Sequence, residues 1–243
     1  MFGFLKKKTS KINFGHVKTD MHSHLIPGID DGAQSLEDAV ALIRGLQALG
    51  YEKIITTPHI YKEYYPNTSD VILRGLDGLR VHLQSIGIDI DIAAAAEYFM
   101  DEHFEALMKK GDLLSFGDQY VLVEMSFYYE TPKVFEYIFE LCSKGYRPIL
   151  AHPERYVYYA NTFDKYHDFK ERGCLLQMNL LSLTGYYGKP VQQNALRLAK
   201  SGLLDFVGTD LHKERQLKAL EAALTQSKVI KLLESKQFLN SLL

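Results

Sequence analysis

The stretch YVLVEMSFYYETPKVFEYIFELCSKGYRPILA, residues 120–151, alternates between two apolar runs and a helical pattern. The runs VLVEM and PILA are short and nearly all apolar, whereas residues 132–144 show helical spacing and stop at Gly145. Strands covered by helices on both faces have this continuous apolar character, and a helix that links two strands allows them to lie parallel. The stretch therefore predicts a strand at 120–125, a helix at 132–144 and a parallel strand at 147–151.

The same alternation extends along the chain. Further strands are predicted at residues 17–21, 53–57, 88–95, 175–179 and 205–209. Further helices are predicted between Ser35 and Gly50 and at residues 69–83, 101–110, 162–172 and 190–201. Seven strand–helix units predict an α/β fold, a (β/α)7 barrel one unit short of the eightfold barrel, with a doubly wound open sheet as the alternative. No linker rich in Gly, Pro or Ser divides the chain, so we expect a single domain at 1–243.

The composition is that of a folded, soluble protein and excludes several functions. Of 243 residues, 47% are apolar and 24% are charged, and 28 basic against 30 acidic residues give a net charge of −2. Such a chain does not bind nucleic acid through bulk positive charge. The basic start has no apolar signal segment, and no run reaches the ~20 apolar residues of a membrane span. We therefore expect a cytoplasmic protein with no membrane insertion.

Histidines and acids gather where the predicted strands end. They are His22 and His24 after the first strand, His59 after the second, Glu97 after the third, Glu124 at the end of the fourth, His152 after the fifth, and Asp210 and His212 after the seventh. The carboxyl ends of parallel barrel strands lie on one face, so these side chains would converge. Because such a cluster repels and loses hydration unless cations lie within it, we expect a centre with several metal ions rather than a structural polar network.

Arg155 lies three residues beyond His152, in the sequence His-Pro-Glu-Arg. Its planar guanidinium can donate paired hydrogen bonds to a phosphate group, which carries about −1.5 to −2 charges near neutral pH. The alternative is a salt bridge between Arg155 and Glu154 or another acid. A phosphate monoester is therefore the expected class of substrate.

Five blocks carry a resemblance to a known family: DMHSHLIPGIDDG (residues 20–32), TPH (57–59), AAEY (95–98), AHPERY (151–156) and GTDLH (208–212). In this order and spacing they resemble the polymerase and histidinol phosphatase (PHP) superfamily. More closely, the chain looks like the manganese-dependent bacterial protein-tyrosine phosphatases of capsule and exopolysaccharide loci. The resemblance implies a distorted seven-stranded (β/α)7 barrel of the PHP type with three divalent metal ions, Mn²⁺ first, with Fe and Zn as alternatives.

The resemblance also implies which residues bind these ions. His22, His24, Glu97 and Asp210 would hold one ion, Glu97 would bridge to a second that Glu124 and His152 also bind, and Asp31, His59 and His212 would hold the third. Asp30 is the alternative to Asp31, which we favour because it directly precedes Gly32. Three divalent ions together with Arg155 would outweigh the four carboxylates, which suits a dianionic phosphate.

The implied reaction is metal-assisted hydrolysis of phosphotyrosine in proteins. Arg155 and Asp210 would be catalytic, and Arg155 would also bind the substrate phosphate. A tyrosine leaving group, with a pKa of about 10, needs less protonation than an alkyl alcohol, and the sequence does not identify a general acid. The implied partner is the tail of a membrane-anchored bacterial tyrosine autokinase that regulates capsule or exopolysaccharide synthesis.

Tyrosines just beyond the strand ends predict an aromatic mouth over the centre, although packing of the loops would explain the same pattern. They lie at positions 61, 64, 65, 128, 129, 156, 158, 159, 186 and 187. Both cysteines, Cys142 and Cys174, are expected to be buried apolar residues, because neither fits the C-x5-R pattern of cysteine-based phosphatases.

Three other functions stay open on the sequence. A PHP-type phosphatase of a small molecule, such as histidinol phosphate or a sugar phosphate, would share the metal centre. An amidohydrolase-like barrel would commonly carry a bridging lysine where Glu124 stands. A regulatory barrel without activity would keep the metals for stability alone.

Overall fold

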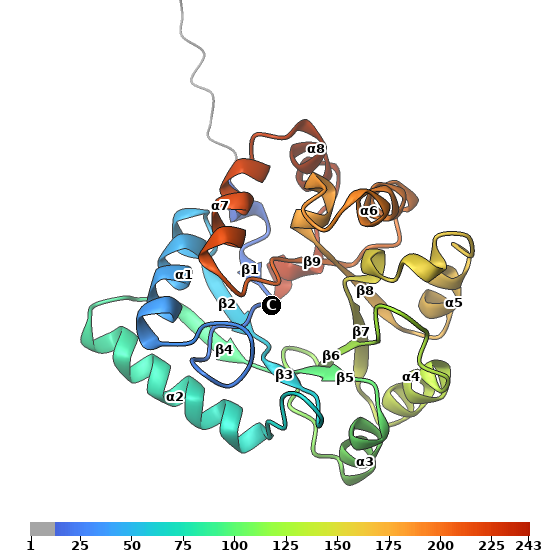
Figure 1. Ribbon diagram of the computed structural model, residues 1–243, viewed down its shortest axis with the longest axis horizontal. Coiled ribbons are helices and arrows are strands. Elements are labelled where there is room, and N and C mark those ends of the chain that lie inside the picture. Colours follow the sequence, from blue (N-terminus) through green and yellow to red (C-terminus); the bar gives the residue numbers. More distant parts are fainter. Residues whose placement is uncertain (1–12) are drawn as a thin grey trace, which may run out of the picture.

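The computed structural model describes residues 13–243, so the basic start of the chain at 1–12 lies outside the described residues. The strands are β1 (Thr19–Asp20), β2 (Lys53–Thr56), β3 (His59–Ile60), β4 (Asp91–Ala94), β5 (Glu97–Phe99), β6 (Tyr120–Glu124), β7 (Arg147–Ala151), β8 (Leu175–Asn179) and β9 (Phe206–Gly208). The α-helices are α1 (Leu36–Ala48), α2 (Ser69–Ser85), α3 (Glu102–Lys110), α4 (Val134–Ser143), α5 (Lys165–Glu171), α6 (Lys189–Ser201), α7 (Glu214–Ala223) and α8 (Ser227–Ser235). Short 3-10 helices are η1 (Phe14–His16), η2 (Pro153–Arg155), η3 (Val157–Tyr159), η4 (Leu180–Thr184) and η5 (Leu239–Leu242). The strands lie near the centre of the molecule with the helices around them (Figure 1).

All strands pair in parallel, which confirms the predicted α/β class. Their hydrogen bonds form two sheets, one with the order β1-β2-β4 and one with the order β3-β5-β6-β7-β8-β9. Among residues 13–243, these ladders do not form one closed sheet. The predicted strands at 120–125, 147–151 and 175–179 are β6, β7 and β8, and the predicted strand at 17–21 is reduced to the two residues of β1.

The strands predicted at 53–57 and 88–95 are β2 and β4, and each is followed by a short strand that the sequence did not predict. β3 begins beyond Pro58, and β5 begins after the interruption at residues 95–96. Proline has no backbone N–H and cannot donate to a ladder. The two neighbouring segments, residues 56–58 and 95–97, stay in contact where the ladder is interrupted. Ala95 N donates to Thr56 O at 2.9 Å, and Glu97 N donates to Pro58 O at 3.1 Å.

Side-chain caps begin three of the helices at or beside the predicted positions. Ser35 accepts a hydrogen bond from Asp38 N before α1, Thr68 caps α2, and Asp101 accepts from Phe104 N before α3. Such caps satisfy backbone N–H groups that have no partner within the helix. Helices α7 and α8 follow His212, in a stretch for which the sequence predicts no element.

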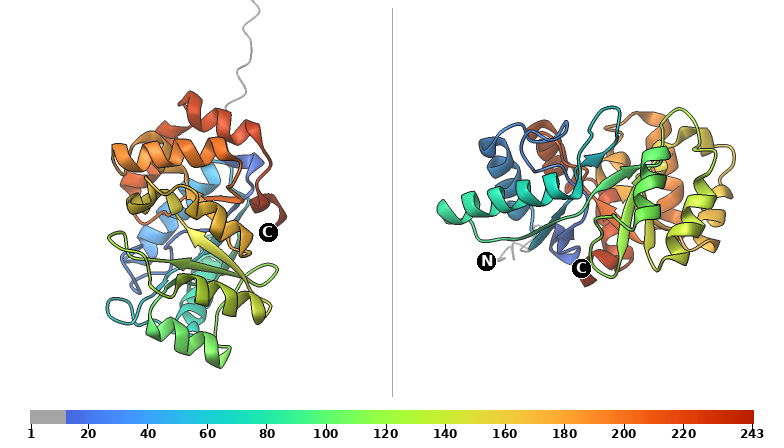
Figure 2. Two further views of the ribbon diagram at one scale, coloured as in Figure 1. Left: turned by 90° about the vertical axis from the view of Figure 1, so that its right-hand side faces the viewer. Right: turned by 90° about the horizontal axis from the view of Figure 1, so that it is seen from below.

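The apolar core has an outer and an inner part. The outer part lies between helices and strands, and the inner part contains side chains such as Met21, Ile55, Leu122, Ile149 and Phe206, which come from five different strands or strand ends. The C-terminal end of the chain lies beside the first described residues (Figure 2). Side chains from both sheets therefore pack together in the inner part of the core.

The two cysteines differ from each other. Cys174 is buried as predicted, whereas Cys142 is exposed on α4, so the prediction for Cys142 is wrong. The apolar face of α4 is built from Val134, Ile138 and Leu141, and Cys142 lies next to this face rather than within it. No helix in residues 13–243 combines the length and apolar character needed to cross a bilayer.

Candidate metal centre

The centre lies where the strands end, and the local backbone presents its side chains. His22 and His24 follow β1, while His152 and Asp210 follow β7 and β9. His152 has a φ of 35° and Asp210 a φ of 51°, in the left-handed region that side chains other than glycine rarely adopt. Backbone held in this region is often found at functional sites, where the surrounding contacts maintain it.

One group joins His22, His24, Glu97 and Asp210, all of them buried. His22 Nε2 lies 3.0 Å from Glu97 Oε2 and 3.4 Å from Asp210 Oδ1. His24 Nε2 lies 3.4 Å and 3.5 Å from the same two oxygens. Two imidazole nitrogens and two carboxylate oxygens thus face one small volume, a donor set that suits a divalent transition metal.

A second group surrounds the other side of Glu97. His59 Nδ1 lies 3.1 Å from Glu124 Oε1 and 3.4 Å from Glu97 Oε2. His152 Nε2 lies 3.0 Å from Glu97 Oε1 and 3.7 Å from Glu124 Oε2. Glu97 Oε2 thus faces His22, His24 and His59, and Glu97 Oε1 faces His152, so this carboxylate lies between the two groups of ligands.

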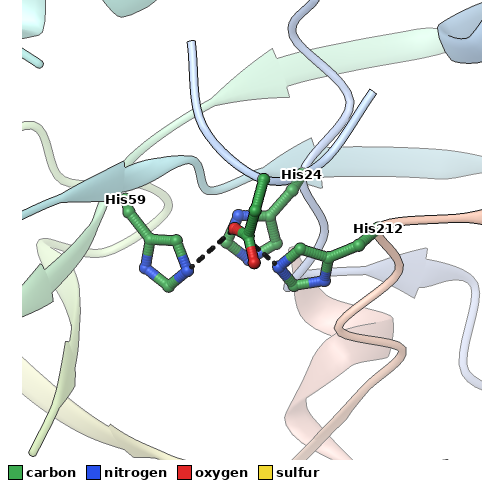
Figure 3. A group of neighbouring side chains, drawn as sticks. His24, His59 and His212 are labelled. Carbon is green, nitrogen blue, oxygen red and sulfur yellow. Dashed lines mark ion pairs between the residues drawn. The ribbon is translucent and has the colours of Figure 1, made fainter. Parts of the chain in front are cut away.

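A third group consists of His24, Asp31, His59 and His212. Asp31 Oδ1 lies 3.6 Å from His59 Nε2 and 3.4 Å from His212 Nε2. The imidazoles of His24, His59 and His212 gather around this point, and dashed lines mark the two ion pairs (Figure 3). Asp31 is half-exposed, so this part of the centre is the most open to solvent.

Asp30 and Asp31 have different environments. The Asp30 carboxylate accepts hydrogen bonds from Gly32 N at 2.9 Å and from His59 N at 3.1 Å, and it lies 2.8 Å from His24 Nδ1. A carboxylate only accepts, so His24 carries its proton on Nδ1 and turns Nε2 toward the centre. The geometry thus makes Asp30 an orienting residue and leaves Asp31 facing the imidazoles.

The electrostatics of the centre require positive charge. Burial raises the pKa of Glu97, but His22 and His59 hold it well below its ordinary value. Burial lowers the pKa of His22, but Glu97 and Asp210 raise it, to about 9. Protons on histidine therefore balance the buried carboxylates in the absence of cations, and divalent cations can replace them.

Buried atoms without partners support the same interpretation. His24 Nε2 and His59 Nδ1 are buried, and neither has a hydrogen-bond partner among residues 13–243. A buried polar atom without a partner is unfavourable, and both of these nitrogens are aimed at carboxylates at metal-ligand spacing. The residues present therefore fit a centre for several divalent cations.

Arg155 lies beside this centre and is not paired with Glu154. Its NH1 donates to Asp210 Oδ2 at 3.2 Å. One nitrogen of Arg155 therefore forms an ion pair with another acid, as the alternative prediction from the sequence allowed. The guanidinium carbon lies 4.0 Å from the ring centroid of Phe127 and 4.8 Å from that of Tyr187. Among residues 13–243, its other N–H groups have no protein acceptor, so they can donate to a ligand.

A cavity of about 500 Å³ opens over the centre. Of the tyrosines predicted to form an aromatic mouth, Tyr65, Tyr186 and Tyr187 line it. Tyr156 and Tyr159 are buried in the core instead, so loop packing is the correct interpretation for them. Lys213 and Arg215 also line the cavity and add positive charge that the sequence did not predict as part of the site.

Sequence reasoning also missed two polar residues on β8. Gln177 lies 2.8 Å from His22 Nδ1, and Asn179 Nδ2 donates to Asp210 Oδ2 at 2.7 Å. The sequence did contain an indication of their role, because these two polar side chains interrupt the otherwise apolar strand LLQMN at alternate positions. On a buried strand such residues must find polar partners.

The fold and the site together define a class of protein: a parallel α/β protein with a candidate multi-metal hydrolytic centre at the carboxyl ends of its strands. The family model for capsular polysaccharide synthesis, CpsB/CapC, matches residues 18–236. The chain belongs to this family, which confirms the resemblance seen in the five sequence blocks.

Named relatives and a solved structure agree with this membership. The chain is 32% identical over 207 residues to the tyrosine-protein phosphatase YwqE of Bacillus subtilis, a match covering 84% of this chain and 81% of that protein. It is 26% identical over 199 residues to the tyrosine-protein phosphatase CpsB of Streptococcus pneumoniae, covering 79% and 82%. The chain also superposes on a solved structure from a study of YwqE of Bacillus subtilis and CpsB of Streptococcus pneumoniae, which are described as metal-dependent tyrosine phosphatases. The TM-score is 0.76 at 27% identity, and the match covers 90% of this chain and 96% of that one.

Proposed function

We propose that this protein is a metal-dependent protein-tyrosine phosphatase. Membership of the CpsB/CapC family and the names of its relatives support this activity. The observation that carries it is the position of Arg155, which lines the same cavity as the clustered imidazoles and carboxylates and, among residues 13–243, has N–H groups without a protein acceptor. A positively charged fork beside a cation centre is suited to a dianionic phosphate monoester.

Three divalent ions would occupy the centre, Mn²⁺ first, with Fe and Zn as alternatives. His22, His24, Glu97 and Asp210 would hold the first, Glu97, Glu124 and His152 the second, and Asp31, His59 and His212 the third. The spacing supports the first set directly, and Asp31, His59 and His212 lie together in the third group, which also includes His24. The second set is supported by His152 Nε2, which lies 3.0 Å from Glu97 Oε1 and 3.7 Å from Glu124 Oε2, although His59 also faces these two carboxylates. The hydrogen bonds of Asp30 support Asp31 as the ligand.

When bound, divalent cations supply a water nucleophile at neutral pH and neutralise charge on the phosphoryl oxygens. The chain itself positions the substrate. Arg155 is held between Phe127 and Tyr187, so its guanidinium is oriented before the phosphate arrives. Its charge stabilises the phosphoryl oxygens as they become more negative in the transition state. Asp210, one of the two proposed catalytic residues, fixes the guanidinium through NH1.

The aromatic side chains at the cavity support a tyrosine leaving group. Tyr65 stacks on His59 with ring centroids 5.2 Å apart, and Tyr186 is exposed at the rim. Rings of this kind can pack against the phenyl group of phosphotyrosine while its phosphate reaches the centre. A peptide substrate also fits an open cavity better than a small molecule that needs enclosure.

We propose further that the strands form one distorted seven-stranded barrel and that residues 1–243 form one domain. If β2 with β3 and β4 with β5 each count as one broken strand, seven strands follow one another around the interior. Contacts between the first and last strands support closure: Asp210 N donates to His22 O at 2.8 Å, and His24 N donates to Leu211 O at 3.0 Å. Asn240 also donates to the backbone oxygens of Thr19 and Val207.

The proposed partner is the phosphotyrosine-containing tail of a membrane-anchored tyrosine autokinase, met in the cytoplasm. The capsule connection in the family description supports it. By removing phosphate from that tail, the enzyme would regulate capsule or exopolysaccharide synthesis.

The test is phosphate release from a phosphotyrosyl peptide, a phosphoseryl peptide and histidinol phosphate, each with Mn²⁺ and with a chelator. We expect release from the phosphotyrosyl peptide alone, abolished by the chelator. Release mainly from histidinol phosphate would keep the metal centre and replace the substrate. Metal binding without release from any of the three would instead indicate a regulatory barrel.

A further inference from the structure

Strand β8 contributes no candidate metal ligand, yet a buried relay of hydrogen bonds runs from it to two ligands of the first proposed ion. His22 Nδ1 lies 2.8 Å from Gln177 Oε1, Gln177 Nε2 donates to Asn179 Oδ1 at 3.0 Å, and Asn179 Nδ2 donates to Asp210 Oδ2 at 2.7 Å. Gln177 and Asn179 are both fully buried, and their spacing of two places them on one face of the strand.

The direction of the relay follows from its last member. An ionised carboxylate only accepts, so Asn179 must present its NH₂ group to Asp210 and its oxygen to Gln177. Gln177 must then present its NH₂ group to Asn179 and its oxygen to His22. His22 therefore carries a proton on Nδ1. Without a cation, Nε2 is protonated as well and donates to Glu97 Oε2 at 3.0 Å, and a cation bound at Nε2 would replace that proton.

The relay also divides the two oxygens of Asp210. Oδ2 accepts hydrogen bonds from Asn179 and from Arg155. Oδ1 lies 3.4 Å from His22 Nε2 and 3.5 Å from His24 Nε2, so it is the oxygen that faces the first group of ligands. The Gln177 end of the relay thus leaves His22 Nε2 for the first proposed ion, and the Asn179 end leaves Asp210 Oδ1 for the same ion.

The end of β8 is itself fixed from the Arg155 turn. Glu154 Oε1 accepts a hydrogen bond from Asn179 N at 3.0 Å and from Ser182 Oγ at 2.6 Å. Glu154 Oε2 has no hydrogen-bond partner among the described residues, so these contacts of the carboxylate rest on Oε1. Breaking either bond would leave a further unfavourable buried polar atom. Asn179 is therefore held in place through both its backbone and its side chain.

Building on the metal-dependent function above, we propose that Gln177 and Asn179 are positioning residues that select His22 Nε2 and Asp210 Oδ1 as ligand atoms for one cation. A purely structural role would require only that the two side chains fill space on β8. The two roles predict different Mn²⁺ affinities for variants in which the side chain keeps its size but loses its hydrogen bonds.

The test measures Mn²⁺ affinity by calorimetry on the full chain, stripped of metal, for three variants of β8. Gln177→Met keeps the size but removes the acceptor for His22, and we expect one of the cation sites to bind Mn²⁺ about 10- to 100-fold less tightly. Gln177→Glu keeps that acceptor but removes the donor to Asn179, so the affinity should fall by less than in Gln177→Met. Asn179→Leu removes the other end of the relay and should resemble Gln177→Met.

Ser182→Ala is the matched control, because Ser182 is equally buried and contacts Glu154 without touching His22 or Asp210. Its Mn²⁺ affinity should be unchanged. Nitrogen NMR of the Zn²⁺-loaded protein provides a second readout, with His22 in the single Nδ1–H form in the unchanged protein and in Gln177→Glu.

Each outcome has a distinct meaning. Folded Gln177→Met and Asn179→Leu proteins that bind Mn²⁺ as the unchanged protein does would overturn the relay and leave the phosphatase function standing. Equal losses in Gln177→Met and Gln177→Glu would also overturn it, because keeping the acceptor for His22 Nδ1 would then make no difference to the affinity. Failure of the unchanged protein to bind Mn²⁺ would overturn the metal centre and the relay together.

Discussion

Replacing Arg155 by alanine tests the phosphate-binding role most directly. The guanidinium lies in the cavity between two aromatic rings, and one of its nitrogens is occupied by Asp210. Its remaining N–H groups are free to donate to a phosphate, while none of its atoms belongs to the groups that could hold a cation. Removing the side chain should therefore weaken phosphate binding without removing the metals.

The size of the effect follows from the contacts that are lost. A hydrogen bond to a charged group contributes about 1.5 to 3 kcal/mol. One such contact to the phosphate therefore corresponds to a rise in KM of about 10- to 100-fold. Arg155→Lys keeps the charge but not the planar fork, so we expect a smaller rise than for alanine.

The assay is hydrolysis of a phosphotyrosyl peptide over a range of concentrations, with metal content and thermal unfolding measured on the same samples. Arg197→Ala is the control, because Arg197 also lies over a phenyl ring, that of Phe163 at 4.2 Å, and donates to a backbone oxygen away from the cavity. Unchanged KM and kcat in Arg155→Ala, or an equal loss in Arg197→Ala, would refute the phosphate-binding role.

Three further predictions concern the metal centre. His152→Ala should abolish turnover while the protein stays folded by circular dichroism, and turnover at the original rate would contradict its assignment as a ligand. Asp31→Asn should lower the affinity for the third cation more than Asp30→Asn does, as measured by calorimetry, because Asp31 faces the imidazoles directly whereas Asp30 acts through His24 and the backbone of His59. The reverse order would exchange their roles. In the metal-free protein, burial lowers the pKa of His22 but its carboxylate neighbours raise it to about 9, above its unfolded value. The resulting stability is present below pH ~6.5 and is lost as the pH rises toward 9, so thermal unfolding in chelator should occur at lower temperature at pH 9 than at pH 6.5, and a flat or rising profile would contradict it.

The gathering of the candidate ligands could be predicted from the sequence because it depends on strand ends. Once residues 120–151 are recognised as a parallel strand–helix–strand unit, the ends of all such strands must lie on one face. His22, Glu97 and His152 therefore converge although they are far apart in the chain. The ladder break at Pro58 was visible as a proline, but its effect on pairing depends on the neighbouring strand.

The parts that could not be predicted depend on which atom faces which. Adjacent residues such as Asp30 and Asp31 have the same chemistry, and only the turn geometry makes one bond to His24 and the other face His212. Gln177 acquires its role only when β8 packs beside His22. Helices α7 and α8 carry ordinary apolar faces with no motif, so their position follows from tertiary packing rather than from local signals.

The centre also lies where the first and last strands of the described chain meet. Asp20 accepts hydrogen bonds from Thr209 across a separation of 189 residues, and His22 and Asp210, which lie two residues and one residue further along, are proposed ligands of one cation. Closing so long a loop loses chain entropy, which the contacts at the junction must offset. A cation bound by both segments would strengthen this junction more than any other part of the fold. We therefore expect chelation to increase amide hydrogen exchange first in β1 and in the segment after β9, ahead of β6 and β7, whereas a uniform increase would show that the cations do not tie the first and last strands together.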